Sequence, residues 1–99
     1  MKKLKIFVLL LFSVQIYGQT GIVSGFVTDS SSGEALIGAN VILLETGQGM
    51  ATDINGYYII QTIPRGKNTV MVSYVGFDIF REELDFAEGE SKKLNIQLS

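Results

Sequence analysis

The sequence predicts an all-β domain, a single seven-stranded β-sandwich, and three observations lead to this class. From Gln19 onward, short runs rich in valine, isoleucine and aromatic residues alternate with clusters of glycine, serine and asparagine. No segment of this stretch repeats apolar residues at helical spacing for more than about one turn. The last run, Lys93 to Leu98, alternates polar and apolar residues throughout, as half-buried strands do.

The first strand is expected at Ile22–Asp29, because Val23, Gly25 and Val27 fall on one face of an extended chain. A cluster of serines and a glycine, Ser30–Glu34, follows it and predicts a turn.

Six further strands are expected on the same grounds. The clearest lies between a Pro-Arg-Gly turn and a Gly-Phe pair, where Val70, Val72 and Tyr74 alternate with the residues at 69, 71 and 73. Leu36 is expected to turn inward just before the second strand. The expected ranges are Ala39–Glu45, Met50–Asp53, Tyr57–Ile63, Asn68–Val75, Ile79–Leu84 and Lys93–Leu98.

Residues 1–18 have the layout of a secretory signal peptide. Three lysines form a basic start, an apolar run extends from Ile6 to Val14, and the small residue Gly18 precedes Gln19. A membrane-spanning helix needs about 20 apolar residues, and this run is shorter. We therefore expect residues 1–18 to be removed on export, which leaves residues 19–99 as the mature domain in the periplasm or at the periplasmic face of the outer membrane.

The composition of the mature chain excludes several classes of function. Removing the three leader lysines leaves 8 − 3 = 5 basic residues against 10 acidic ones, a net charge of −5. Such a surface repels the phosphates of nucleic acid, so no nucleic-acid partner is expected. The chain has no histidine and no cysteine, which excludes the Ser-His-Asp and Cys-His nucleophile systems and zinc sites built from these ligands.

The stretch Asp53-Ile54-Asn55-Gly56 resembles the start of a calcium loop. In the helix–loop–helix type of loop, glycine stands at the sixth position and a bidentate glutamate at the twelfth. With Gly56 sixth, Ala51 is first and Thr62 is twelfth, and neither supplies a carboxylate. Asn and Gly instead suit the bend of a hairpin, with Asp53 accepting bonds from the amides of the turn. We predict a hairpin and no metal.

The remaining candidates for chemistry are carboxylates and aromatic rings. Two facing acids can hydrolyse glycosides, but a charged sheet edge that discourages aggregation is the reading we favour for the acidic stretch. Tyr57 and Phe77 are expected at the surface, where they could stack on sugars. We predict no enzyme, no catalytic residue and no cofactor. The acidic stretch comprises Glu82, Glu83, Asp85, Glu88 and Glu90.

The order of these pieces resembles the carboxypeptidase regulatory-like domain. The resemblance covers nearly all of the mature chain and implies a seven-stranded, transthyretin-like sandwich. Its motifs are a G-x-V-x-D strand, a G-x-x-L-x-G-A-x-V crossing, a T-D-x-x-G-x-Y-x-I hairpin, a P-x-G turn and an S-Y-x-G-[FY] strand. The turn and motif positions carried over are Gly25, Asp29, Gly33, Gly38, Asp53, Gly56, Tyr58, Pro64, Gly66, Tyr74 and Gly76.

A domain of this kind behind a signal peptide looks like the N-terminal extension of SusC-like TonB-dependent receptors, which import nutrients through an outer-membrane barrel. The resemblance implies a non-catalytic interaction module whose partner is a receptor plug and barrel or a periplasmic protein, bound for instance by strand addition at a sheet edge. The alternative is a free-standing secreted module that binds carbohydrate or protein. We expect the DNA beyond the Ser99 codon to encode the plug and barrel.

Overall fold

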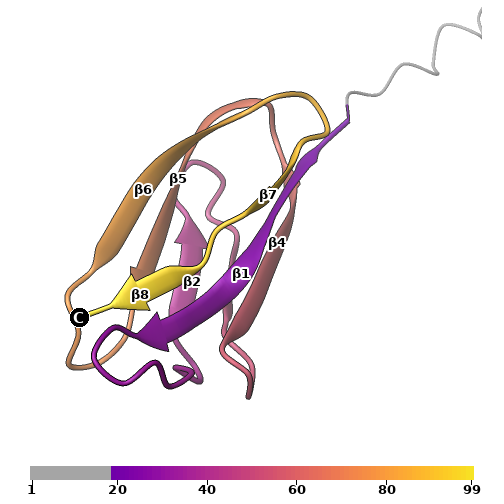
Figure 1. The fold of residues 1–99 in the computed structure, drawn as a ribbon. Helices are drawn as coiled ribbons and strands as arrows, with labels where there is room; N and C mark the ends of the chain where they lie inside the picture. The colour runs from indigo at the N-terminus through magenta and orange to yellow at the C-terminus, as the bar shows by residue number, and fades with distance from the viewer. Residues whose placement is uncertain (1–18) are drawn as a thin grey trace, which may run out of the picture.

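The computed structural model describes residues 19–99, which fold into two packed β-sheets (Figure 1). The predicted signal peptide, residues 1–18, lies outside the described residues. No helix occurs within residues 19–99, so none there is long and apolar enough to cross a membrane. The strands are β1 (Gly21–Asp29), β2 (Asn40–Leu43), β3 (Gly49–Ala51), β4 (Tyr57–Ile63), β5 (Gly66–Ser73), β6 (Phe80–Phe86), β7 (Ser91–Lys93) and β8 (Ile96–Leu98).

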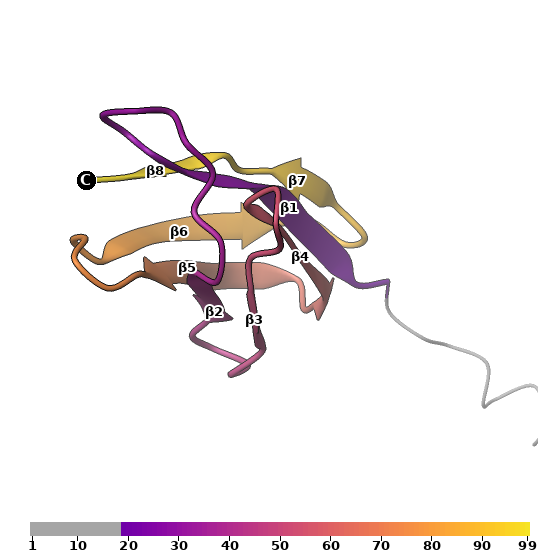
Figure 2. The same cartoon turned by 90° about the horizontal axis from the view of Figure 1, so that it is seen from below.

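The two sheets face each other as layers (Figure 2). In the first, β1 pairs with β4 on one side and with β7 and then β8 on the other. In the second, the strand order is β3-β2-β5-β6. All pairs of strands are antiparallel except β1 with β7 and β1 with β8, which are parallel.

The expected continuous strand at Lys93–Leu98 is wrong, because the chain forms two short strands with a break between them. At the break, the Leu94 carbonyl lies so close to Gly25 of β1 that any side chain at Gly25 would collide with it. The break is still hydrogen-bonded: the Leu94 amide donates to the Ser24 carbonyl at 2.8 Å, and the Phe26 amide donates to Asn95 Oδ1 at 3.0 Å. A side-chain amide thus replaces one bond of the ladder.

The expected strand Tyr57–Ile63 is confirmed at both ends, and the boundaries of the other strands differ from those expected by at most two residues. The third strand ends at Ala51 rather than Asp53, because Thr52 bonds to a loop instead of a strand. Its amide donates to the Ala39 carbonyl and its hydroxyl donates to the Leu36 carbonyl, while the Ala39 amide donates to Thr52 Oγ1 at 2.9 Å. Thr52 therefore joins the β1–β2 connection to the β3–β4 hairpin.

The core lies between the two sheets and is built by the alternating faces of the strands. Val23, Gly25 and Val27 are buried on one face of β1, and Leu36 is buried as expected. Two polar side chains share the interior, Thr52 and Asn68, and both are hydrogen-bonded. The buried apolar residues are Val23, Val27, Leu36, Ala39, Val41, Leu43, Tyr58, Ile60, Ile63, Val70, Val72, Phe86, Ile96 and Leu98.

A bulge interrupts the pairing of β1 with β4. Gly21 lies opposite Ile63 and Val23 lies opposite Ile60, so β4 carries one residue more than β1 over this interval. Within it, Thr62 has a φ of 60°, and no other non-glycine among the described residues has a positive φ. A β-branched residue is unfavourable in this left-handed region, so the bulge stores backbone strain.

The two ends of the described chain lie at opposite ends of the sandwich (Figure 1). β1 begins at one end, and β8 finishes at the other, beside the turn that joins β5 to β6. There the Asp78 amide donates to the Ser99 carbonyl at 2.8 Å.

Candidate interaction surfaces

The Asp53–Gly56 stretch forms the bend of the β3–β4 hairpin. Asp53 Oδ1 accepts hydrogen bonds from the amides of Asn55 and Tyr57, both at 2.9 Å, and the Gly56 amide donates to the Asp53 carbonyl. The carboxylate is therefore used in closing the turn. Within residues 19–99 no three acidic side chains come together in a group that could hold a metal ion.

Gly56 also brings the hairpin against β1. Its φ is 75°, and a Cβ atom there would lie 2.7 Å from the Val27 carbonyl oxygen and 3.1 Å from the Ala35 Cβ. The same contact contains a hydrogen bond, since the Val27 amide donates to the Gly56 carbonyl at 2.8 Å. Gly56 thus fixes the distance between the hairpin and the first strand.

Tyr58 meets the break between β7 and β8. Its buried hydroxyl donates to the Leu94 carbonyl at 2.6 Å, the same carbonyl that approaches Gly25. Burial, with a smaller contribution from the negative charge of Glu82, raises the pKa of Tyr58 well above its usual range. The phenol therefore stays protonated and acts as a structural donor. It has no role as an acid or base near neutral pH.

The acidic stretch lies on β6 and the following turn, at the outer edge of the second sheet. The Leu44 amide donates to the Thr69 carbonyl and the Thr69 amide donates to Glu45 Oε1, so the backbone of Thr69 faces β2. In an antiparallel pair the direction of these groups alternates. The backbone groups of Glu83, opposite Thr69, therefore face the free edge, which is flanked by charged side chains.

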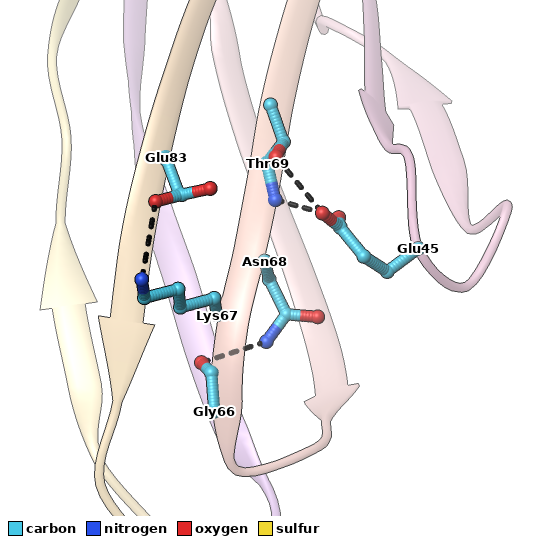
Figure 3. A network of polar contacts seen from close by, with 6 residues as sticks. All are labelled: Glu45, Gly66, Lys67, Asn68, Thr69 and Glu83. Atoms are coloured by element: carbon cyan, nitrogen blue, oxygen red, sulfur yellow. Dashed lines mark hydrogen bonds and ion pairs between the residues drawn. The ribbon is translucent and has the colours of Figure 1, made fainter.

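Short polar contacts connect β2, β5 and β6 (Figure 3). Just beyond the end of β2, the Glu45 carboxylate accepts hydrogen bonds from the Thr69 amide at 2.6 Å and from the Thr69 hydroxyl at 2.8 Å. These bonds lower the pKa of Glu45, and the bond from the amide has the larger effect. Lys67 Nζ lies 4.0 Å from Glu83 Oε1, with both side chains exposed, so this pair contributes little to stability.

Asn68 is buried and ties the β4–β5 turn to the core. Its Nδ2 donates hydrogen bonds to the carbonyls of Pro64 at 2.9 Å and Gly66 at 3.2 Å, so two backbone acceptors of the turn are paired with a buried side chain. Neither this role of Asn68 nor that of Thr52 is predicted from the sequence. A polar residue at a core position of a strand pattern was the available signal for Asn68.

Two further carboxylates close turns. Asp29 accepts from the Ser31 amide at 2.9 Å and the Ser31 hydroxyl at 2.8 Å, which lowers its pKa. Glu90 accepts from the Ala87 amide at 2.9 Å and pairs with Lys92 at 3.2 Å, and the Ala87 bond is the main cause of its lowered pKa. Together with Asp53, these acids stabilise the fold locally and do not converge on one site.

The motif residues predicted from the sequence lie at successive bends rather than around one centre. Gly25 and Tyr58 meet at Leu94, and Asp53 and Gly56 share a hairpin. The others hold separate turns. Asp29 ends β1 and Gly33 lies in the turn after it, Gly38 lies before β2, Pro64 lies between β4 and β5, Gly66 begins β5, and Tyr74 and Gly76 lie between β5 and β6.

One shallow hollow, here named the C-terminal hollow, has no charged lining. It encloses about 330 Å³ beside the end of β8. Its rim is apolar: the side chain of Val75 is 96% exposed and that of Ile79 is 58% exposed, with Ile37, adjacent to the lining, at 53%. The lining residues are Gly38, Asn40, Ser73, Tyr74, Val75, Phe77 and Ile79.

Phe77 and Tyr57, expected at the surface, are both half-buried. Phe77 packs against Tyr74 with ring centroids 5.7 Å apart, and Tyr57 packs against Phe26 at 5.3 Å. Each of the two rings is therefore part of a tilted aromatic pair.

A second hollow, of about 440 Å³, is charged and involves the β4–β5 turn and the end of β6. Arg65, Asp85 and Glu90 contribute to its lining, together with Phe86. Lys92 Nζ lies 5.6 Å from the centre of the Phe86 ring, a cation–π contact. These two hollows thus differ in their lining, which is uncharged in the first and charged in the second.

Residues 23–99 match the model of the CarboxypepD_reg-like domain family. The chain belongs to this family. The resemblance read from its motifs is thereby confirmed, and so is the predicted fold class, a transthyretin-like β-sandwich. A TonB-dependent receptor, P3 of Formosa agariphila, is 36% identical to this CarboxypepD_reg-like chain over 69 residues. The match covers 70% of the chain but only 7% of that receptor's length.

Solved structures share the fold at low sequence identity. The major pilin subunit BcpA of Bacillus cereus superposes with a TM-score of 0.67 and 19% identity, over 82% of this chain and 30% of the pilin. A catechol 1,2-dioxygenase of Acinetobacter radioresistens superposes with a TM-score of 0.64 and 15% identity, over 87% of this chain and 53% of the enzyme. Because the fold serves both a pilin and an enzyme, function has to be argued from the residues.

Proposed function

We propose that this CarboxypepD_reg-like domain is a non-catalytic interaction module at the periplasmic side of the outer membrane, and that it forms the front end of a TonB-dependent nutrient receptor. The observation that carries the proposal is the 36% identity to a TonB-dependent receptor over 70% of the chain. In this reading residues 1–18 are an export signal, and transport itself belongs to other parts of the receptor.

The arrangement of the chain supports a role in series with other domains. The described polypeptide begins at one end of the sandwich and finishes at the other, so the rest of a receptor would continue from the end opposite Gln19 (Figure 1). The carboxylates that accept hydrogen bonds, such as those of Asp53 and Glu45, bind backbone amides at turns and strand ends. With no histidine or cysteine in the chain, contact is the role that this surface supports best.

The proposal is tested by measuring the size and the cellular location of the native product. An epitope tag inserted after Gly47, in the exposed bend between β2 and β3, marks the protein in its own cell. We expect a tagged polypeptide far longer than 99 residues in the outer-membrane fraction. A tagged product of 99 − 18 = 81 residues in the periplasm or medium would reject the receptor.

The alternative is a free-standing module that binds carbohydrate or protein. The Tyr74–Phe77 ring pair beside the polar side chains of Asn40 and Ser73 favours it, because sugars are bound by aromatic faces together with hydrogen-bonding groups. Titration of the purified domain with oligosaccharides, followed by amide chemical shifts, tests this alternative. Saturable shifts confined to the C-terminal hollow would support it.

A further inference from the structure

The C-terminal hollow combines two features: an exposed apolar residue at its rim and a lining without charge. Val75 stands at the apex of a turn closed by the Phe77 amide donating to the Tyr74 carbonyl at 3.1 Å, so its exposure is fixed by backbone geometry. The lining contains aromatic rings and no charged side chain. Depletion of charge with enrichment in tyrosine and phenylalanine is typical of the core of a protein–protein interface.

The end of the chain indicates what could cover this surface. Asp78 lies between two residues of the lining, Phe77 and Ile79, and its amide holds the Ser99 carbonyl. Polypeptide that continues from Ser99 therefore starts at the rim of the hollow. A receptor of the related kind has most of its length outside the matched domain.

We propose that the C-terminal hollow is the docking site for the receptor segment that directly follows this domain, with an apolar side chain of that segment seated between Val75 and Ile79. This inference rests on the proposed function. A tethered segment meets its site at an effective concentration in the millimolar range, so a small hollow is sufficient for occupancy. Docking fixes the orientation of the sandwich relative to the rest of the receptor.

The test uses two forms of the domain, residues 19–99 alone and the same residues fused to about 20 residues that follow the matched region of receptor P3, enough to cross one end of the sandwich when extended. The chain has no cysteine, so Val75→Cys introduces a single thiol. We expect a maleimide to modify Cys at position 75 several-fold more slowly in the fused form. Ile54, in the hairpin bend, is 76% exposed, so Ile54→Cys is the matched control and should react equally in both forms.

Equal rates at position 75 in the two forms would overturn the proposal, and Ile79→Cys provides a second thiol if Val75→Cys does not fold. Protection by an oligosaccharide rather than by the fused segment would also overturn it and assign the hollow to a sugar. The proposed function can survive either result, because it is decided by the size and location of the native product.

Discussion

Gly56 shows why a single residue can set the geometry of this domain. Its positive φ would cost any L-residue strain, and its Cα faces the Val27 carbonyl with no room for a side chain. Gly47 has nearly the same φ, 76° against 75°, but nothing lies within 4 Å of a Cβ built there. The two positions therefore separate backbone strain from steric contact.

We predict that Gly56→Val lowers the free energy of unfolding by about 2 kcal/mol or more, and that Gly47→Val lowers it by about 1 kcal/mol. Urea denaturation of both variants measures the difference. Equal losses would show that the close approach to Val27 contributes nothing.

Gly25, by contrast, is needed because of a contact from the far end of the sequence. The Leu94 carbonyl occupies the place of its side chain, and Tyr58 holds that carbonyl. The sequence motifs include Gly25 and Tyr58 but not the reason for them, which is Leu94, 94 − 25 = 69 positions after Gly25. The alternation of Lys93–Leu98 was consequently interpreted as one strand.

Among the elements, β4 carries the clearest strain. Thr62 occupies a left-handed conformation in the bulge opposite β1, and asparagine tolerates that conformation better than a β-branched residue does. We predict that Thr62→Asn raises the free energy of unfolding by about 1 kcal/mol. Thermal unfolding of this variant is compared with that of Thr20→Asn, a change at an exposed position without a positive φ. Equal effects of the two changes would refute the assigned strain.

The junction of β2 with β5 gives the domain a pH-sensitive contact. Folding lowers the pKa of Glu45, chiefly through the Thr69 amide, so its contribution is present above its ordinary value of 4.5 and is lost as the pH falls through and below that value. We predict that Glu45→Gln reduces the fall in Tm between neutral and acidic pH. Some of the fall remains, because Asp29 and Glu90 also have lowered pKa values.

Glu88→Gln, in the exposed turn after β6, is the comparison. An acid slope of Tm that is identical in Glu45→Gln, Glu88→Gln and the parent domain would argue against the Glu45 contact.

The β3–β4 hairpin should be indifferent to calcium. Asp53 Oδ1 already accepts two amides of the turn, and the stretch provides no glutamate at the twelfth position. Because a ligand that binds only the folded state must raise its stability, we predict the same Tm with millimolar calcium as with a chelator. A calcium-dependent rise would establish a metal site at this bend.

At the scale of the whole molecule, the sequence predicted the class, the approximate positions of most strands and the family, since these depend on local alternation and turn residues. It did not predict the C-terminal hollow, whose lining comes from the β1–β2 connection, the first residue of β2, the end of β5 and the β5–β6 turn. The sequence pattern places Val75 and Ile79 at the ends of two expected strands and does not predict that both are exposed. Surfaces assembled from segments that are distant in the sequence leave no periodic signal in a single sequence.

The central claim is that the sandwich works by protein contact at its C-terminal end, and one cross-linking measurement tests it most directly. A photo-reactive amino acid replaces Val75 in the tagged native protein in its own cell, and Ile54 in a parallel strain, and mass spectrometry identifies the attached peptide. We predict a cross-link from position 75 to the receptor segment that follows the domain, and none from position 54. No cross-link from position 75, or equal cross-linking from both positions, would contradict the account.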